Sequence, residues 1–246
     1  MIDDPLLQRA QRLWAGLAGT PVVFRDAAVE VAVSPKSLLC PPGWVGIVAL
    51  GNAVIATAPD RDVAETVRRA LNDLPTTAMT DPATMRDTLP VDATLGPATL
   101  AYCDAADFRP ADSTTVETIP AGHADLETLL TRVPTDDADE SGLAEITSPA
   151  FVVRTATEVI AAAGYRTWPG DTAHISVLTA SAERGRGLAR VVATAAITNA
   201  LQSDLLPQWR ARPEASRRVA RALGFHELGS QLSIHLTPVD SHAGRS

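Results

Sequence analysis

The sequence predicts a two-domain α/β protein in which helices and strands alternate along most of the chain. Three observations lead to this prediction. Apolar residues alternate with polar ones in several short runs and recur at helical spacing in the segments between them. A polar, proline-containing stretch at 104–113 separates two such series. In the second series, an alternating strand near 172–179 leads through two glycines into an Ala-rich helix.

The first domain, residues 1–112, is expected to be a smaller mixed α/β domain. Leucines at helical spacing predict a first helix, and Asp60 or Asp62 is a suitable N-cap for a second one. Gly51-Asn52 divides a long apolar run into a predicted hairpin. The expected helices are 5–17, 60–74 and 81–89, and the expected strands are 22–24, 29–33, 44–58 with its turn, and 98–103.

The second domain is expected to span residues 113–238 and to be followed by a disordered tail at 239–246. It contains an acidic stretch at 135–142 and a series of apolar runs with strand or helix periodicity. The expected strands are 115–119, 150–153, 158–165, 174–179 and 231–236; the expected helices are 124–133 and 186–202, with a further strand and helix inside 206–223.

Composition excludes several function classes. With 21 basic and 29 acidic residues the net charge is −8, which argues against nucleic acid as a partner and suits a neutral or cationic one. Cys40 and Cys103 lack metal-ligand spacing, so we expect two buried thiols and neither a metal site nor a disulfide. No apolar run approaches the roughly 20 residues of a membrane span, and the chain start lacks a basic leader, so the cytoplasm is the expected location.

The segment Arg184-Gly185-Arg186-Gly187-Leu188-Ala189 is the most informative motif. A helix start leaves backbone N–H groups without partners and carries partial positive charge, so it suits a phosphate. Glycine allows a close approach of the backbone, and the two arginines add fixed charge. The segment therefore predicts a site for a diphosphate, unless the glycines serve only a tight turn.

Two other phosphate motifs do not fit. A P-loop needs a lysine, and the only lysine of the chain is Lys36; a dinucleotide fingerprint needs glycine or alanine where Arg190 stands. Arg184-x-x-Gly187-x-Ala189 directly after a strand, followed by Leu223-Gly224-Phe225 at the end of a later helix, resembles the GNAT superfamily, the GCN5-related N-acetyltransferases. The resemblance covers about 114–237, and its specific motifs lie within 177–225.

The resemblance implies a twisted, mixed but mostly antiparallel sheet flanked by helices, with acetyl-CoA as cosubstrate and no metal. In similar proteins the strand before the glycine turn splays from its neighbour and pairs with the pantetheine arm. That role would go to Val177, Leu178 and Thr179, and an amide near Leu178 would hold the thioester oxygen. The diphosphate would be held by the backbone amides of Arg184, Gly185, Arg186, Gly187, Leu188 and Ala189. Ser216 would form a hydrogen bond to the cofactor or protonate the thiolate.

The catalytic residues are less constrained, because two family positions differ. A tyrosine that often serves as general acid is replaced by Ala220, and a common asparagine is replaced by Pro213. Ser216, Tyr165 or water could supply the proton. His174 is the first candidate for the base, because its ordinary pKa near 6.5 suits the task, and Glu140 is the second.

Each of these residues could instead have only a structural role. His174 could be a plain structural histidine, Ser216 an exposed helix residue, and the acidic stretch a solvated cap rather than an attractor for an amine. Trp168 and Tyr165 could line the acceptor site or belong to the core.

The resulting hypothesis is an N-acetyltransferase in which a small-molecule or peptide amine attacks acetyl-CoA directly, through a tetrahedral intermediate and without a covalent enzyme intermediate. The alternative is a noncatalytic acyl-CoA-binding or regulatory module, which the residues at 213 and 220 make plausible. The first domain could be a degenerate second copy of the fold that serves the acceptor site or a homodimer.

Overall fold

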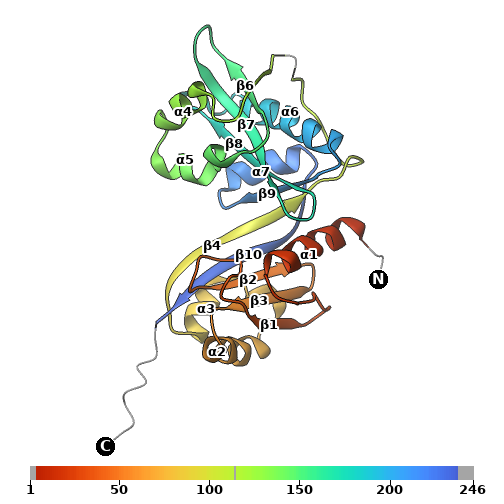
Figure 1. Cartoon of the computed structure of the whole chain (residues 1–246), viewed down its shortest axis with the longest axis vertical. Helices are drawn as coiled ribbons and strands as arrows, with labels where there is room; N and C mark the ends of the chain where they lie inside the picture. Colours follow the sequence, from red (N-terminus) through yellow and green to blue (C-terminus); the bar gives the residue numbers. More distant parts are fainter. Residues whose placement is uncertain (1–3, 114, 238–246) are drawn as a thin grey trace, which may run out of the picture. The chain divides into compact units, whose positions relative to one another are not determined.

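The computed structural model describes residues 4–113 and 115–237, which form two compact units. The first unit contains 4–98 and 228–237, and the second contains 99–227. Each unit is a sheet covered by helices (Figure 1), so the predicted α/β class is confirmed. The tail expected at 239–246 lies outside the described residues.

The first unit has the strand order β1-β3-β2-β10-β4. Strand β1 pairs with β3 in parallel, whereas β2 pairs with β3 and β10 in antiparallel fashion. Helices α2 and α3 bury apolar side chains against one face of this sheet. The elements are α1 (Pro5–Leu17), β1 (Val29–Val33), β2 (Val45–Leu50), β3 (Ala53–Ala58), α2 (Arg61–Asn72), η1 (Thr76–Ala78), α3 (Pro82–Thr88), β4 (Val91–Tyr102) and β10 (His226–Leu236).

Local signals predicted most of this unit. The Asp60 side chain accepts a hydrogen bond from the Val63 amide at 2.9 Å and is the N-cap of α2, while Asp62 lies in the first turn. The turn at Gly51 joins β2 and β3 as expected, and its φ of +60° is the left-handed conformation that favours glycine. The strand predicted at 22–24 is wrong: that segment is irregular, and Val23 is 55% exposed.

The second unit has the strand order β4-β9-β8-β7-β6-β5. Its neighbours are antiparallel except for β8 and β9, which run parallel with α6 between them in the chain. The elements are β5 (Glu117–Ile119), α4 (Ala124–Thr131), α5 (Thr135–Ser141), η2 (Leu143–Glu145), β6 (Ala150–Arg154), β7 (Val159–Trp168), β8 (Thr172–Thr179), η3 (Ser181–Glu183), α6 (Leu188–Gln202), β9 (Leu206–Ala211) and α7 (Glu214–Ala222).

Two cores enclose the sheet of the second unit. Helices α6 and α7 pack on one face with Ala173, Ile175 and Trp209, whereas α4, α5 and η2 lie over the other face with Ala162 and Leu178 (Figure 1). Side chains on a strand alternate between the faces. The residues of β8 and β9 therefore divide into one set under α6 and a second set facing α4 and α5.

The grouping of residues differs from the boundary predicted between 112 and 113. Residues 99–102 of β4 pair with β9, so they belong to the second unit, and Gly229–Ile234 pair with β2, so they belong to the first. Because strand pairing joins segments far apart in sequence, a polar stretch such as 104–113 did not reveal where the units divide.

Helix α7 ends as the Leu-Gly-Phe sequence predicts. Gly224 has a φ of +93°, its amide donates to the Arg221 carbonyl at 3.1 Å, and the Phe225 amide donates to the Ala220 carbonyl at 3.1 Å. This is the hydrogen-bond pattern of a Schellman stop. Phe225 then packs edge-on against Trp209, with ring centroids 5.6 Å apart.

Candidate functional site

Strands β8 and β9 separate part-way along their length. Their parallel register contains only the pairs Thr172–Leu206, Ala173–Pro207 and His174–Gln208, although β8 continues to Thr179. On its other edge β8 pairs with β7 over all eight of its residues. Within the described chain, the edge of β8 beyond His174 thus has no strand partner on the β9 side, and its backbone can pair with an extended ligand.

The turn after β8 has the conformation that its glycines permit. Gly185 and Gly187 have φ values of +80° and +79°, and a Cβ added at either one would meet no atom within 4 Å. The first amides bonded back to the Gly187 carbonyl are those of Arg190 at 3.0 Å and Val191 at 3.3 Å. The amides from Arg184 to Ala189 therefore precede the first hydrogen-bonded turn of α6, beside open space.

The two arginines of this turn take part in ion pairs. Arg184 contacts Asp137 of α5 at 2.8 Å, and Arg186 contacts Glu183. The Arg184 and Asp137 side chains are 48% and 37% exposed, so their pair contributes little to stability. A phosphate group can replace such a carboxylate at modest free-energy cost.

A sequence model of the GNAT acetyltransferase family matches residues 148–230, which include the divergent strands and the glycine turn. The match identifies residues 148–230 as a segment of the GNAT superfamily type. Similarity to this superfamily indicates acyltransferase chemistry in general. No curated protein matches the chain.

Two solved structures with similar folds are GNAT proteins. An acetyltransferase from Colwellia psychrerythraea is 14% identical, with 94% of this chain and 96% of that one covered and a TM-score of 0.49. A GCN5-related N-acetyltransferase-like protein from Streptococcus suis is 17% identical, with 93% and 97% covered and a TM-score of 0.48.

His174 lies at the last paired position of β8 and β9, where the two strands diverge. Its ring stacks on Trp168 with centroids 4.2 Å apart, and its Nδ1 is 2.5 Å from the Gln208 side-chain oxygen. With that oxygen as acceptor, Nδ1 carries the proton and Nε2 keeps its lone pair. The structure thus places two of the predicted residues, His174 and Trp168, side by side.

The pKa of His174 is lowered from 6.5 to about 4. Burial of the ring between its neighbours is the main cause, because desolvation disfavours the charged form. The positive charges of Arg210 and Arg166 lower the pKa further, while the hydrogen bond to Gln208 opposes these effects. The imidazole is therefore neutral at pH 7, and it is a weak base.

Ser216 lies on the other side of the sheet from His174. Its Oγ accepts a hydrogen bond at 3.0 Å from Nε1 of Trp209, whose side chain belongs to the core under α6 and α7. The hydroxyl proton of Ser216 can still be donated. Ala220 is buried in the same core, and Pro213 precedes α7 without a side-chain cap, so neither position offers a proton donor.

The other two candidates have different surroundings. Glu140, on α5, binds Arg212 through the arginine Nε at 2.9 Å, so it is the partner of a cation. Tyr165 is buried under α6, and its hydroxyl donates to the Asn199 side-chain oxygen at 2.8 Å. Arg166, the next residue on β7, is the cross-strand partner of His174, so the side chains of Arg166 and His174 share a face of the sheet. Neighbouring residues of a strand point to opposite faces, so the Tyr165 side chain lies on the face opposite His174.

Sequence reasoning missed Gln208 and Arg210. Gln208 is fully buried, binds His174, and its amide nitrogen has no hydrogen-bond partner among the described residues. The sequence contains one signal for these residues, the alternate spacing of Gln208, Arg210 and Arg212, because alternate residues of a strand share a face. This spacing indicates a polar face on the strand. Only the register of β9 beside β8 shows that this face contains His174.

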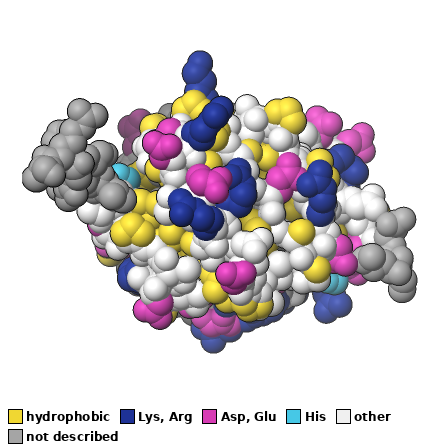
Figure 2. Space-filling view, turned by 90° about the horizontal axis from the view of Figure 1, so that it is seen from below, with side chains coloured by type: hydrophobic (Ala, Val, Ile, Leu, Met, Phe, Trp, Pro, Cys, Tyr) yellow, Lys and Arg dark blue, Asp and Glu magenta, His cyan; other side chains and the backbone are white. Residues whose placement is uncertain are grey.

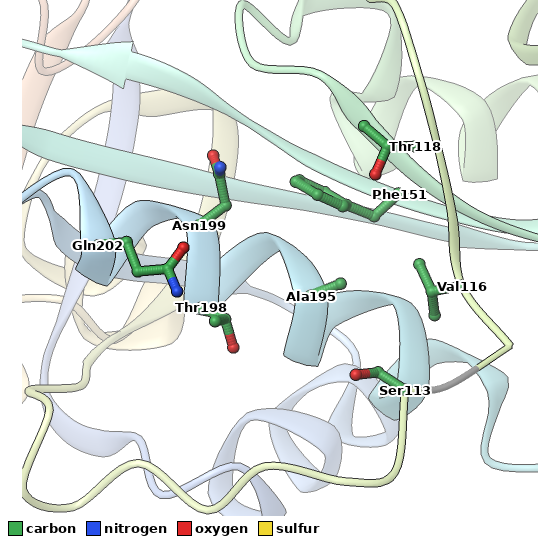
Figure 3. Close-up of a pocket in the computed structure, with 8 residues that line it drawn as sticks. All are labelled: Ser113, Val116, Thr118, Phe151, Ala195, Thr198, Asn199 and Gln202. Carbon is green, nitrogen blue, oxygen red and sulfur yellow. The ribbon is translucent and has the colours of Figure 1, made fainter.

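A separate pocket of about 260 Å³ lies between α6, β6 and the segment that contains Val116 and Thr118 (Figure 3). Its lining includes Thr198, Asn199 and Gln202 of the helix and Phe151 of β6. Its lining contains no charged side chain and none of the predicted site residues. The pocket therefore has no part in the site at the divergent strands.

Other ligand classes find little support in the described residues. They contain no group of three potential metal ligands, and no helix among them is long and apolar enough to cross a membrane. In Figure 2, basic and acidic side chains are interspersed, and no broad basic patch gathers on that face. Both cysteines are free; Cys103 is buried as predicted, whereas Cys40 is only partly buried. Burial raises the pKa of both thiols, to about 12 and about 11 respectively.

Proposed function

We propose that this protein transfers an acetyl group from acetyl-CoA to an amine. The observation that carries the proposal is the separation of β8 from β9 beyond His174, directly before a glycine turn with open helix-start amides. A free strand edge suits the amide-rich pantetheine arm, and the helix start suits the diphosphate. Along the chain, the free edge of β8 comes directly before the helix-start amides. One coenzyme A molecule could therefore place its pantetheine arm along the strand and its diphosphate at the helix start.

The residues present fit this cosubstrate. Val177, Leu178 and Thr179 lie in the part of β8, residues 175–179, that has no partner on the β9 side; pantetheine would lie along this edge, and an amide near Leu178 would hold the thioester oxygen. The Thr179 hydroxyl is buried without a hydrogen-bond partner among the described residues, an unusual state for a polar atom next to open backbone. The amides from Arg184 to Ala189 would hold the diphosphate, for which the absent side chains of the two glycines leave room.

Acetyl-CoA supplies the activated acyl group. The amine nitrogen forms a bond to the acyl carbon, the carbon–sulfur bond breaks, one proton leaves the nitrogen, and the thiolate takes up a proton. Deprotonating an alkylammonium at pH 7 costs about 4.6 kcal/mol, so the site must select or create the neutral amine. With a pKa of about 4, His174 is too weak a base to deprotonate an alkylammonium, but its neutral Nε2 can accept a hydrogen bond from the neutral amine and so select that form. The nitrogen becomes far more acidic once the carbon–nitrogen bond has formed, and its proton can then pass to Nε2.

The thiolate needs less help. A thiol has a pKa near 8.5, so its anion is a competent leaving group at neutral pH. Ser216 is a hydroxyl donor on the α6–α7 side of the sheet, opposite His174, with its oxygen oriented by Trp209. We assign Ser216 a hydrogen bond to the cosubstrate rather than an essential proton transfer. Glu140 has a smaller part in this scheme, because it is paired with Arg212.

Calorimetry with CoA and a turnover assay with an amine panel test the proposal. Gly187→Glu should abolish CoA binding, because a carboxylate would occupy the diphosphate position. Gly122→Glu is the matched control: Gly122 also has a positive φ of +72° with nothing within 4 Å of an added Cβ, but it lies in the turn before α4. The control should bind CoA like the unmodified protein.

Three outcomes separate the hypotheses. Turnover that depends on Gly187 but not on Gly122 supports the acetyltransferase. Binding of CoA without turnover of any amine would instead support a noncatalytic acyl-CoA-binding module. Absence of heat with CoA at millimolar concentration would overturn both.

A further inference from the structure

The imidazole ring of His174 is held by contacts from both neighbouring strands. Trp168 of β7 stacks on it with ring centroids 4.2 Å apart and planes inclined by 17°. Gln208 of β9 places its side-chain oxygen 2.5 Å from Nδ1. The stacking fixes the plane of the ring, and the hydrogen bond fixes which edge faces β9. Together these contacts leave the ring one orientation at the point where β8 and β9 diverge.

The hydrogen bond also selects one form of the neutral ring. A neutral imidazole has one nitrogen with a proton and one with a lone pair. Among the described residues the hydrogen-bond partner of the ring lies at Nδ1, so Nε2 remains for an incoming group. If the proton were on Nε2, the ring would offer a donor to the amine, and the Gln208 oxygen would face a lone pair. Only the Nδ1–H form can accept a hydrogen bond from the amine.

Packing alone does not require a carboxamide at position 208. Gln208 is fully buried, and its amide nitrogen has no hydrogen-bond partner among the described residues. Most buried donors have a partner, because an unpaired one lowers stability. A methionine could fill a similar volume without a buried polar atom. The contact that accounts for a glutamine here is the one between its oxygen and His174.

The charge at position 208 matters as well as the hydrogen bond. The charged groups on the surrounding strands, α5 and η2 are Arg166, Arg210, Arg212, Glu140 and Glu145. A carboxylate in place of the amide would raise the pKa of His174, because a negative charge close to the ring favours the imidazolium. The amide accepts the same hydrogen bond without a charge, so the ring stays neutral and Nε2 keeps its lone pair.

We propose that Gln208 is a positioning residue whose side-chain oxygen holds His174 as the neutral Nδ1–H tautomer and so keeps Nε2 available to the acceptor amine. Gln208 acts through His174 and needs no contact with a substrate. The inference rests on the proposed acetyltransferase function for the role of the amine, but the state of the ring can be measured without turnover.

Nitrogen NMR of protein labelled with ¹⁵N-histidine tests the tautomer directly, because the two ring nitrogens differ in chemical shift according to which one carries the proton. His174 is one of five histidines, and its signals are those that His174→Gln removes. At pH 7 we expect the proton on Nδ1 in the unmodified protein and in Gln208→Glu. In Gln208→Met the proton should move towards Nε2. A proton on Nε2 in the unmodified protein, or an unchanged ring in Gln208→Met, would overturn the inference.

The matched control is Gln231→Met. Gln231 is the other buried glutamine among the described residues and lies on β10 in the first unit. This variant also replaces a buried carboxamide by a thioether, and it should leave the His174 signals and the turnover unchanged. An equal effect of both variants would mean that the loss of any buried glutamine disturbs the protein, which would overturn the specific role of Gln208.

Turnover of an amine supplies a second readout. At pH 8 we expect Gln208→Met to lower kcat/KM at least about tenfold, and Gln208→Glu, which retains the acceptor oxygen, to lower it less than about threefold. Equal losses in the two variants would show that the oxygen has no positioning role.

The pH profile separates the two variants further. As pH rises, log kcat/KM for an amine increases with slope one while the amine loses its proton, and with slope two where His174 must also be deprotonated. Gln208→Glu should move the change from slope two to slope one upward by at least about one pH unit. A profile identical to that of the unmodified protein would contradict the role assigned to the uncharged amide.

Two results keep the inference separate from the proposed function. If no amine is turned over, the acetyltransferase proposal fails, and the NMR result for Gln208→Met alone decides whether Gln208 sets the tautomer. The same result decides the inference if the buried carboxylate of Gln208→Glu prevents folding.

Discussion

Removal of the His174 imidazole should change how stability depends on pH. The pKa of this group is about 4 in the folded protein, against an ordinary value of 6.5. Between these values the unfolded chain binds a proton that the folded protein excludes, so the free energy of unfolding falls as pH falls from about 6.5 to about 4. From the two pKa values, the loss attributable to His174 is up to about 1.4 kcal/mol at pH 5.5 and up to about 2.6 kcal/mol at pH 4.5.

Urea unfolding, followed by tryptophan fluorescence at several pH values, measures this effect. His174→Gln cannot take up the proton, so the difference in unfolding free energy between the unmodified protein and the variant should shrink by these amounts on acidification. Other titrating groups affect both proteins alike and cancel in the difference. A difference that stays constant between pH 7.5 and 4.5 would refute the argument that burial and the two arginines keep the ring neutral.

Three further outcomes are expected. Arg210→Gln should raise the pKa of His174, seen by NMR titration of the ring, because it removes the second-largest cause of the lowered value; an unchanged pKa would contradict this. Gly224→Ala should lower the free energy of unfolding by more than about 3 kcal/mol, measured in urea, since its Cβ would lie 1.9 Å from the Asp107 carbonyl oxygen at a φ of +93°; a loss under about 1 kcal/mol would count against the Schellman stop. Ser216→Ala should lower kcat less than about tenfold in the acetyl-CoA assay, because the thiolate leaves without an obligatory acid; a loss above about a hundredfold would make Ser216 the general acid.

The glycine turn at the start of α6, which we propose as the cofactor half of the site, could be predicted from local sequence. Gly187 begins α6 in the left-handed conformation, and the amides before it precede the first hydrogen-bonded turn, as the glycine spacing indicated. The same holds for Gly224 at the end of α7 and for Asp60 at the start of α2. These features depend on residues within one or two turns of the chain, where backbone geometry and capping decide the structure.

The acceptor half depended on contacts that no local pattern contains. No local pattern indicated that Gln208 contacts His174 or that Arg212 contacts Glu140, because the residues of these pairs are 34 and 72 positions apart. The register of β8 beside β9 decides the first contact, and the packing of α5 over the sheet allows the second. For this reason the sequence left two interpretations of the acidic stretch open, an attractor for amines or a solvated cap, and neither included the pairing of Glu140 with Arg212 that the structure shows.

The sequence by itself thus determined the helix starts and stops, the hairpin at Gly51 and the glycine turn, because each is a short-range property of the backbone. Only the tertiary structure decided where the two units divide and what surrounds His174. Sheet pairing selects partners across the whole chain, and the desolvation and charge that set the pKa of a side chain come from those partners.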